Sequence, residues 1–169
     1  MLLTLKAKLA RRRESGGTGD EGFTLIELMV VVGIIAILLA IAIPTFLASR
    51  GKAQDKSAQS SLRNTLTAAK SVYADSNDYT KADTAALTAS EKSLSFAAAG
   101  TDSSGPTNVS TSATTTDFYA ASKSESNVCY YIKDGTSTGT QYYSLTYAAT
   151  TCTGTAAAGL AAASWKAKW

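Results

Sequence analysis

Few side chains in this sequence could perform catalysis, and the ionisable residue in the most unusual setting is Glu27. The 169 residues include no His, so the commonest general base and the commonest metal ligand of proteins are both missing. The abundant Ser and Thr hydroxyls therefore have no imidazole that could activate them as nucleophiles. This composition predicts that the protein is not an enzyme, uses no cofactor and holds no metal ion.

Glu27 lies near the start of a long apolar stretch. No charged residue occurs from Leu28 to Ile43, and the apolar character extends over residues 23–48. A helix of this length can span a bilayer. A charged side chain deep in hydrocarbon costs on the order of 2.5 kcal/mol or more, so the presence of Glu27 requires an explanation.

Three general interpretations of this stretch account for only part of it. A secretory signal would be cut near residues 40–42, which read AIA, but the segment before the apolar stretch is unusually long and hydrophilic. A plain membrane anchor gives no reason for Glu27. A helix cap does, because Thr24 and Glu27 have the spacing of a capping box, and such a cap is compatible with a further role.

Residues 22–28 read GFTLIEL, which resembles the processing motif of type IV prepilins and of the pseudopilins of type II secretion and competence systems. In that family a membrane peptidase cuts after the glycine and methylates the new N-terminal residue. The resemblance implies that Gly22 ends the leader, that Phe23 begins the mature chain and that Glu27 acts in assembly. Pro44 also stands where many of these helices carry a proline.

The residues before the apolar stretch agree with such processing and predict an orientation. Gly22 has no side chain that would obstruct an approaching enzyme. Basic residues from Lys6 to Arg13 precede the stretch, so the positive-inside rule places the leader, residues 1–22, in the cytoplasm and everything after Ser49 outside. We expect a single-pass cytoplasmic (inner) membrane protein that later becomes part of a surface filament.

Helical periodicity continues over residues 49–78. Apolar residues recur there at steps of three or four and predict an amphipathic helix, namely Ala58, Leu62, Leu66, Ala69, Val72 and Tyr73. The polar positions of this segment are interpreted as a solvated face, and they are Lys52, Gln54, Asp55, Lys56, Gln59 and Arg63. Pro44 and Gly51 predict a bend or local melting, because neither residue favours a helix interior.

The remaining residues, 79–169, are predicted to form a variable loop and a small β-sheet head. The long helix should end near Asn77, and residues 83–92 could form a short helix capped by Asp83. Residues 97–116 are rich in Gly, Ser and Thr and are interpreted as a loop or weak strand.

Three segments of the head have the aromatic and β-branched content of strands, namely residues 117–123, 127–133 and 140–148. Short polar turns separate them, so they predict an antiparallel meander. Six side chains are predicted to pack on the helix: Val128, Tyr130, Ile132, Tyr143, Leu145 and Tyr147. The predicted fold class is α+β, a long N-terminal helix on a small antiparallel sheet, as in pilins.

Cys129 and Cys152 are the only two cysteines, and both lie in the predicted exported head. Oxidation is permitted outside the cell, so we expect a disulfide. It would close a loop of about 23 residues and contribute roughly 3 kcal/mol. Two sulfurs without His make an incomplete zinc site, which again argues against a metal.

The sequence therefore predicts a structural subunit of a type IV pilus or a related filament. A pseudopilin of a secretion or DNA-uptake system is the alternative, and a signal-anchored exported binding protein is a more remote one. The expected partners are prepilin peptidase/N-methyltransferase, further copies of the chain with minor pilins, the assembly platform in the membrane, and the lipid bilayer. The net charge of +3 is small, and no dense basic stripe indicates a nucleic-acid site.

Overall fold

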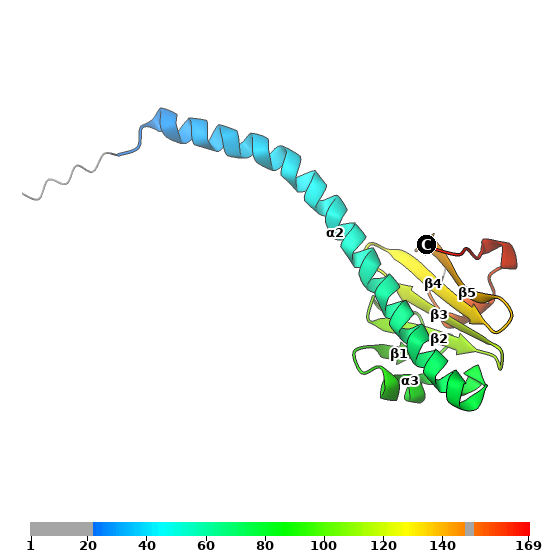
Figure 1. The fold of residues 1–169 in the computed structure, drawn as a ribbon. Helices are drawn as coiled ribbons and strands as arrows, with labels where there is room; N and C mark the ends of the chain where they lie inside the picture. The colour runs from blue at the N-terminus through cyan, green and yellow to red at the C-terminus, as the bar shows by residue number, and fades with distance from the viewer. Residues whose placement is uncertain (1–21, 148–150) are drawn as a thin grey trace, which may run out of the picture. The chain divides into compact units, whose positions relative to one another are not determined.

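The computed structural model describes residues 22–147 and 151–169 (Figure 1). These residues form two compact units, one that ends at Thr45 and one from Phe46 to Trp169. The predicted leader, apart from Gly22, lies outside the described residues. Each unit is considered separately below.

The first unit contains the apolar part of helix α2, which as a whole runs from Leu25 to Ser76. The large apolar side chains of this unit are all exposed, from 88% at Phe23 down to 48% at Ile35. By length and composition, α2 is the one helix in the described chain that could cross a membrane. Exposed apolar residues in such numbers require a lipid or protein environment, as the sequence predicts.

The second unit joins the rest of α2 to a five-stranded sheet with the order β1-β2-β3-β4-β5. Strands β1 and β2 are parallel, and the remaining neighbours are antiparallel. The predicted α+β fold is confirmed. The strands are β1 (Ser95–Ala97), β2 (Asn108–Ala113), β3 (Asp117–Lys123), β4 (Val128–Gly135) and β5 (Gly139–Thr146).

Short helices connect or follow these strands. The 3-10 helix η1 (Tyr79–Lys81) and helix α3 (Thr84–Ser90) follow α2, while α4 (Gly154–Ala158) and η2 (Ala162–Ser164) follow the sheet. The Asp83 side chain accepts a hydrogen bond from the backbone N–H of Ala86 and caps α3, as predicted. The predicted end of the long helix near Asn77 is likewise confirmed.

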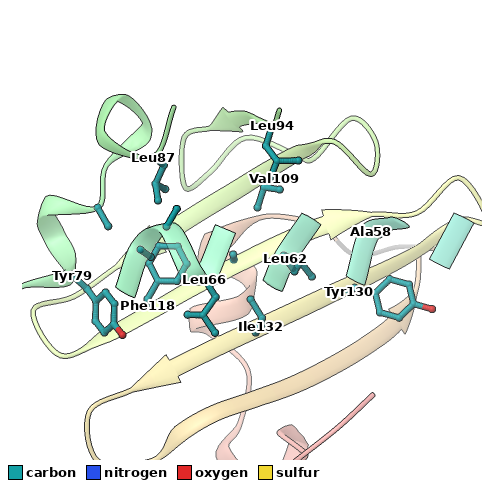
Figure 2. Close-up of a cluster of buried hydrophobic side chains, with 14 residues drawn as sticks. Ala58, Leu62, Leu66, Tyr79, Leu87, Leu94, Val109, Phe118, Tyr130 and Ile132 are labelled. Atoms are coloured by element: carbon teal, nitrogen blue, oxygen red, sulfur yellow. The ribbon is translucent and has the colours of Figure 1, made fainter. Parts of the chain in front are cut away.

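The predicted apolar face of α2 forms the main core (Figure 2). Ala58, Leu62 and Ala69 are completely buried. They pack against Val109, Phe118 and Ile132 from three neighbouring strands and against Leu87 of α3. Because the sheet supplies one apolar side chain per two residues to this face, each strand contributes only a few core residues.

The prediction that Tyr143, Leu145 and Tyr147 pack on the long helix was wrong. Tyr143, Leu145 and Tyr147 pack on the sheet face that is opposite α2, and Tyr142 packs against the α2 core instead. The register explains this, because Tyr142 lies opposite Ile132 and Tyr143 lies opposite Tyr131. The strand carries large side chains on both faces, so the apolar pattern alone did not select the correct one.

That opposite face has its own core, which the C-terminal segment covers. The second cluster contains Tyr131, Cys129, Cys152 and Ala157, with Trp165 nearly buried beside them. Ala157 belongs to α4, which contacts β2, β3 and β4. The head is therefore a three-layer structure in which α2 and the C-terminal segment enclose the sheet.

Residues 97–116, which were predicted to form a loop or weak strand, contain the last residue of β1, a connecting loop and the whole of β2. Strand β2 contains no aromatic residue, unlike the other four strands. Small residues are required where α4 approaches β2, since a Cβ at Gly154 would lie 2.5 Å from the carbonyl carbon of Thr111. The Ser110 hydroxyl also accepts a hydrogen bond from the Gly154 N–H at 2.9 Å.

The interpretation of the polar α2 positions as a solvated face was wrong for Asp55 and Gln59, whereas Lys52, Lys56 and Arg63 are exposed as predicted. The Asp55 carboxylate accepts hydrogen bonds from the hydroxyls of Ser124 and Ser126 in the turn between β3 and β4. Gln59 is 6% exposed. The exposed Arg63 also contacts the head, because its guanidinium lies 5.0 Å from the ring centroid of Trp169. These polar side chains attach the helix to the head.

A buried carboxylate joins the end of α2 to the sheet. Asp134 of β4 accepts hydrogen bonds from the Tyr79 hydroxyl at 2.7 Å and from the Thr140 hydroxyl, and its Oδ1 lies 2.9 Å from Lys70 Nζ. Burial raises the pKa of Asp134, but the hydrogen bonds from Thr140, Lys70 and Tyr79 outweigh this effect and hold the pKa below its usual range. Burial and the same carboxylate raise the pKa of Tyr79.

Asp134→Asn should therefore destabilise the head at neutral pH and weaken its acid sensitivity. A carboxylate with a lowered pKa stabilises the fold above its unfolded pKa, and this contribution disappears as the pH falls through the folded pKa. We expect a loss of roughly 1–3 kcal/mol at neutral pH, as is typical of hydrogen bonds to a charged group. Denaturant unfolding of wild type and variant at neutral and acidic pH measures this loss. If the two proteins differ in free energy of unfolding by the same amount at both pH values, the Asp134 carboxylate does not stabilise the head in its charged form.

Candidate functional site

The predicted cleavage point lies in exposed, non-helical backbone. Residues 22–24 precede the first turn of α2, and the Phe23 side chain is 88% exposed. A Cβ placed on Gly22 would have no heavy atom within 4 Å. The peptide bond between Gly22 and Phe23 is therefore open to an enzyme in this structure, as a processing site requires.

Thr24 and Glu27 form the capping box that their spacing predicts. Glu27 Oε2 accepts hydrogen bonds from the Thr24 backbone N–H at 2.9 Å and from the Thr24 hydroxyl at 2.7 Å. The Glu27 N–H donates in return to the Thr24 hydroxyl oxygen at 3.3 Å. These contacts satisfy free donors at the start of α2 and fix the carboxylate there.

The capping box leaves part of the Glu27 carboxylate available. Both donors from Thr24 reach Oε2, and no other described residue donates a hydrogen bond to Oε1. The carboxylate is exposed among the side chains of Phe23, Ile26, Val30 and Val31. It can therefore accept a cation from outside the chain without giving up the cap.

Helix α2 is continuous through Pro44 and Gly51, so the structure shows no local melting at either residue. Proline removes one N–H donor from the helix and leaves a carbonyl of the preceding turn without its usual partner. The Thr45 hydroxyl donates to the carbonyls of Ile41 and Ala42 at 3.2 and 2.9 Å, and not to the carbonyl of Ala40, which is the one that Pro44 leaves without an N–H partner. The bend at Pro44 and Gly51 stays a prediction.

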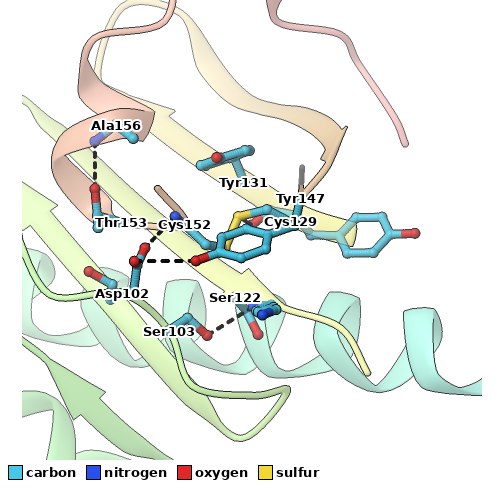
Figure 3. The surroundings of a disulfide bond; sticks show 12 residues. Asp102, Ser103, Ser122, Cys129, Tyr131, Tyr147, Cys152, Thr153 and Ala156 are labelled. Carbon is cyan, nitrogen blue, oxygen red and sulfur yellow. Dashed lines mark hydrogen bonds between the residues drawn. A yellow bond between two sulfur atoms is a disulfide. The ribbon is translucent and has the colours of Figure 1, made fainter. Parts of the chain in front are cut away.

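The disulfide between Cys129 and Cys152 is present, as predicted, with 5.7 Å between the Cα atoms (Figure 3). It connects β4 to the segment that begins at Thr151. Asp102 also holds this segment, because its carboxylate accepts a hydrogen bond from the Cys152 N–H at 2.5 Å and from the Tyr147 hydroxyl at 3.3 Å. The negative charge of Asp102 raises the pKa of Tyr147, which keeps that hydroxyl a donor.

Sequence reasoning missed Asp102, since nothing in the pattern around it separates it from other loop residues. It missed Thr153 as well, whose hydroxyl accepts a hydrogen bond from the Ala156 N–H at 3.0 Å and caps α4. A Thr that follows a half-cystine and precedes a run of Gly and Ala is a weak capping signal that could have been used.

Within the described ranges, 22–147 and 151–169, no three His, Cys, Asp or Glu residues come together as potential metal ligands. Apart from Pro44 and Gly51 inside α2, the site residues predicted from the sequence lie in two places. Gly22, Phe23 and Glu27 lie together at the start of the apolar helix, and Cys129 and Cys152 lie in the head.

Comparison with known proteins finds matches for the segment that contains the first of these groups. Residues 18–43 match the family model described as the prokaryotic N-terminal methylation motif. The chain is 45% identical over 60 residues to the type IV major pilin protein PilA of Myxococcus xanthus, which is 36% of this chain and 27% of the relative. No solved structure matches the chain.

Two further relatives are named as pilus or fimbrial proteins. The type IV wide pilus major component PilA4 of Thermus thermophilus is 40% identical over 73 residues, or 43% of this chain and 56% of the relative. The fimbrial protein EcpB of Eikenella corrodens is 48% identical over 55 residues, or 32% and 35% of the two chains. The chain thus spans about a quarter to about half the length of these relatives, and the resemblance to the type IV pilin family is confirmed.

Proposed function

Because the chain resembles type IV pilins, we propose that it is a structural subunit of a type IV pilus. A membrane peptidase would remove residues 1–22 and methylate Phe23, and the apolar half of α2 would then pack with its counterparts in a helical filament. The relatives are named as pilins or fimbrial proteins and none as an enzyme, which supports a mechanical role. Their names favour a pilus over a secretion pseudopilin.

One observation supports this proposal most strongly, the position of a fixed carboxylate at the beginning of a fully exposed apolar helix. Glu27 is held by Thr24, while Ile26, Val30 and Val31 around it are more than half exposed. A soluble globular protein would bury these side chains against its own core. Here the apolar surface is available to lipid before assembly and to other copies of α2 afterwards.

Cleavage would create the cation that this carboxylate needs. Removal of the leader turns the Phe23 nitrogen into an amine, and N-methylation keeps its positive charge. In a filament, the amine of an incoming subunit would meet Glu27 Oε1 of a subunit already in place. A buried charge is costly alone and acceptable when it is paired and hydrogen-bonded, so both partners would be neutralised only in the correct register.

The leader cations would hold the N-terminus in the cytoplasm, and the head would lie outside the membrane. The second unit suits that location, because its disulfide requires an oxidising compartment. Further proposed partners are the assembly platform and minor pilins, which would extract the subunit from the bilayer and start the polymer.

Shearing of surface filaments tests this function. Cells that express the chain should release filaments in which it is a repeating component. Cells without the prepilin peptidase should retain the chain in the membrane with its leader attached. Recovery of the chain only from periplasm or medium as a soluble monomer would contradict the proposal, and its confinement to a short envelope-bound polymer of a secretion system would favour the pseudopilin alternative.

A further inference from the structure

Three basic residues lie directly after the apolar part of α2, and the function proposed above does not use them. Arg50, Lys52 and Lys56 are all exposed. None of them forms an ion pair with another residue of the described chain, where the ion pairs join Lys70 to Asp134 and Lys133 to Asp117. Their one hydrogen bond runs from Lys56 Nζ to Gln59 Oε1 at 3.2 Å.

The nearby acidic side chains do not neutralise this cluster. Asp55 lies on the same helix, but its carboxylate is turned to the head, where it accepts hydrogen bonds from Ser124 and Ser126. Glu125 belongs to the same turn, and its Oε1 lies 3.9 Å from the position that a Cβ would take at Gly105. The three cations therefore keep a surplus of positive charge that faces outward.

Their position along the chain coincides with the expected edge of a bilayer. Residues 28–47 contain no charge, and 20 helical residues span roughly 30 Å, the thickness of the hydrocarbon core. Arg50, Lys52 and Lys56 come three, five and nine residues later, which is about 4.5, 7.5 and 13.5 Å along the helix axis. The headgroup layer begins at the edge of the hydrocarbon core, and a long Lys side chain can reach back to it from its far side. Basic residues are enriched on the cytoplasmic side of membranes, so three of them at the exported end need a reason.

The distribution of the cations around the helix favours a headgroup layer over a protein partner. Successive residues turn by about 100°, so Lys52 and Lys56 share one side of α2 while Arg50 lies about 160° away from Lys52. A second protein would contact one face of the helix. A planar layer of phosphates surrounds the helix and can bind cations on all sides.

We propose that Arg50, Lys52 and Lys56 form a collar that binds the phosphates of anionic phospholipids on the exported side of the membrane. The collar fixes the depth of the subunit in the bilayer before assembly. Entry into a filament must then break these contacts, so the anionic lipid content of the membrane sets part of the cost of extraction. This inference rests on the proposed function, because it requires that α2 spans a bilayer.

The test uses the full chain, reconstituted into phosphatidylcholine vesicles with a trace of spin-labelled phosphatidylglycerol or spin-labelled phosphatidylcholine. The immobilised fraction of each probe gives the selectivity for the anionic lipid. The variant combines Arg50→Gln, Lys52→Gln and Lys56→Gln, and its matched control combines Lys81→Gln, Lys92→Gln and Lys168→Gln, three exposed lysines of the second unit. The leader cations are the same in all three proteins.

We expect the collar variant to lose at least about threefold of the selectivity for phosphatidylglycerol, and the control to keep it, since each basic residue near the surface contributes separately. High salt should remove the difference between wild type and variant. Inorganic phosphate should compete no better than sodium chloride of equal ionic strength. Unchanged selectivity in the variant, an equal loss in the control, or specific competition by inorganic phosphate would each overturn the collar.

The same samples separate this inference from the proposed function. A chain that resists alkaline carbonate extraction but shows no lipid selectivity spans the bilayer without a collar. A chain that carbonate extracts from the vesicles does not span the bilayer, and the proposed function fails together with the collar.

Discussion

Glu27→Gln should lower the yield of surface filaments at least about tenfold while insertion into the membrane stays intact. Gln keeps the geometry of the capping box, so the start of α2 should be preserved. The substitution removes the negative charge that would pair with the Phe23 amine of the next subunit. An unpaired buried charge costs about 3–5 kcal/mol, and a loss of 1.4 kcal/mol already changes an equilibrium constant by about tenfold.

The capping role and the charge role can be separated with two further variants. Thr24→Val removes the hydroxyl that donates to Glu27 at 2.7 Å but keeps the carboxylate, so filaments should still form. Glu91→Gln is a matched control on the head, because Glu91 also accepts hydrogen bonds from a nearby Ser, Ser93. Quantification of sheared and membrane-bound chain measures both steps. Normal filament yield from Glu27→Gln would refute the pairing role.

Cys152→Ser should lower the free energy of unfolding of the head by roughly 2–5 kcal/mol, the usual effect of a native disulfide in a small exported domain. The bridge closes 23 residues and fixes the segment that covers the second face of the sheet. Without it, the backbone N–H groups of residues 152 and 155, next to the lost bridge, should lose protection from hydrogen exchange. The N–H of Lys166 should keep more, because Lys166 lies farther along the chain and exchanges two backbone hydrogen bonds with Tyr142 of β5.

Thermal unfolding of a head fragment that begins at Arg50 measures this effect with and without reductant. The double variant Cys129→Ala, Cys152→Ala is the control, because its melting should not respond to reductant. Two free thiols in the exported protein, or identical melting of the wild-type fragment in both conditions, would show that the bridge is absent or makes no contribution.

The sequence was most informative where one physical requirement dominates each residue. The apolar stretch must meet lipid, and the apolar positions of the following helix, such as Leu62 and Ala69, must meet the sheet. Both patterns could be read directly. Strand β3 was predicted with its observed bounds of Asp117 and Lys123 because its polar flanks end the pattern clearly.

Prediction failed where a residue has two possible environments. Strand β5 carries Tyr142 toward α2 and Tyr143 toward the C-terminal segment, and the sequence did not reveal that the second face would be covered. Strand β2 is buried through small side chains such as Ser110, whose pattern is that of a loop. Asp55 looked like a solvent-exposed residue of a helix because its partners, Ser124 and Ser126, are distant in the sequence.

Identification of the mature N-terminus by mass spectrometry of sheared filaments tests the central claim most directly. The account predicts an N-terminal peptide that begins with Phe23 and is one methyl group heavier than the unmodified peptide. Its amount should match that of peptides from the head, since every assembled subunit has been processed. A mature chain that begins at Ile43, after a signal-peptidase cut, or a filament subunit that retains residues 1–22 would contradict the account.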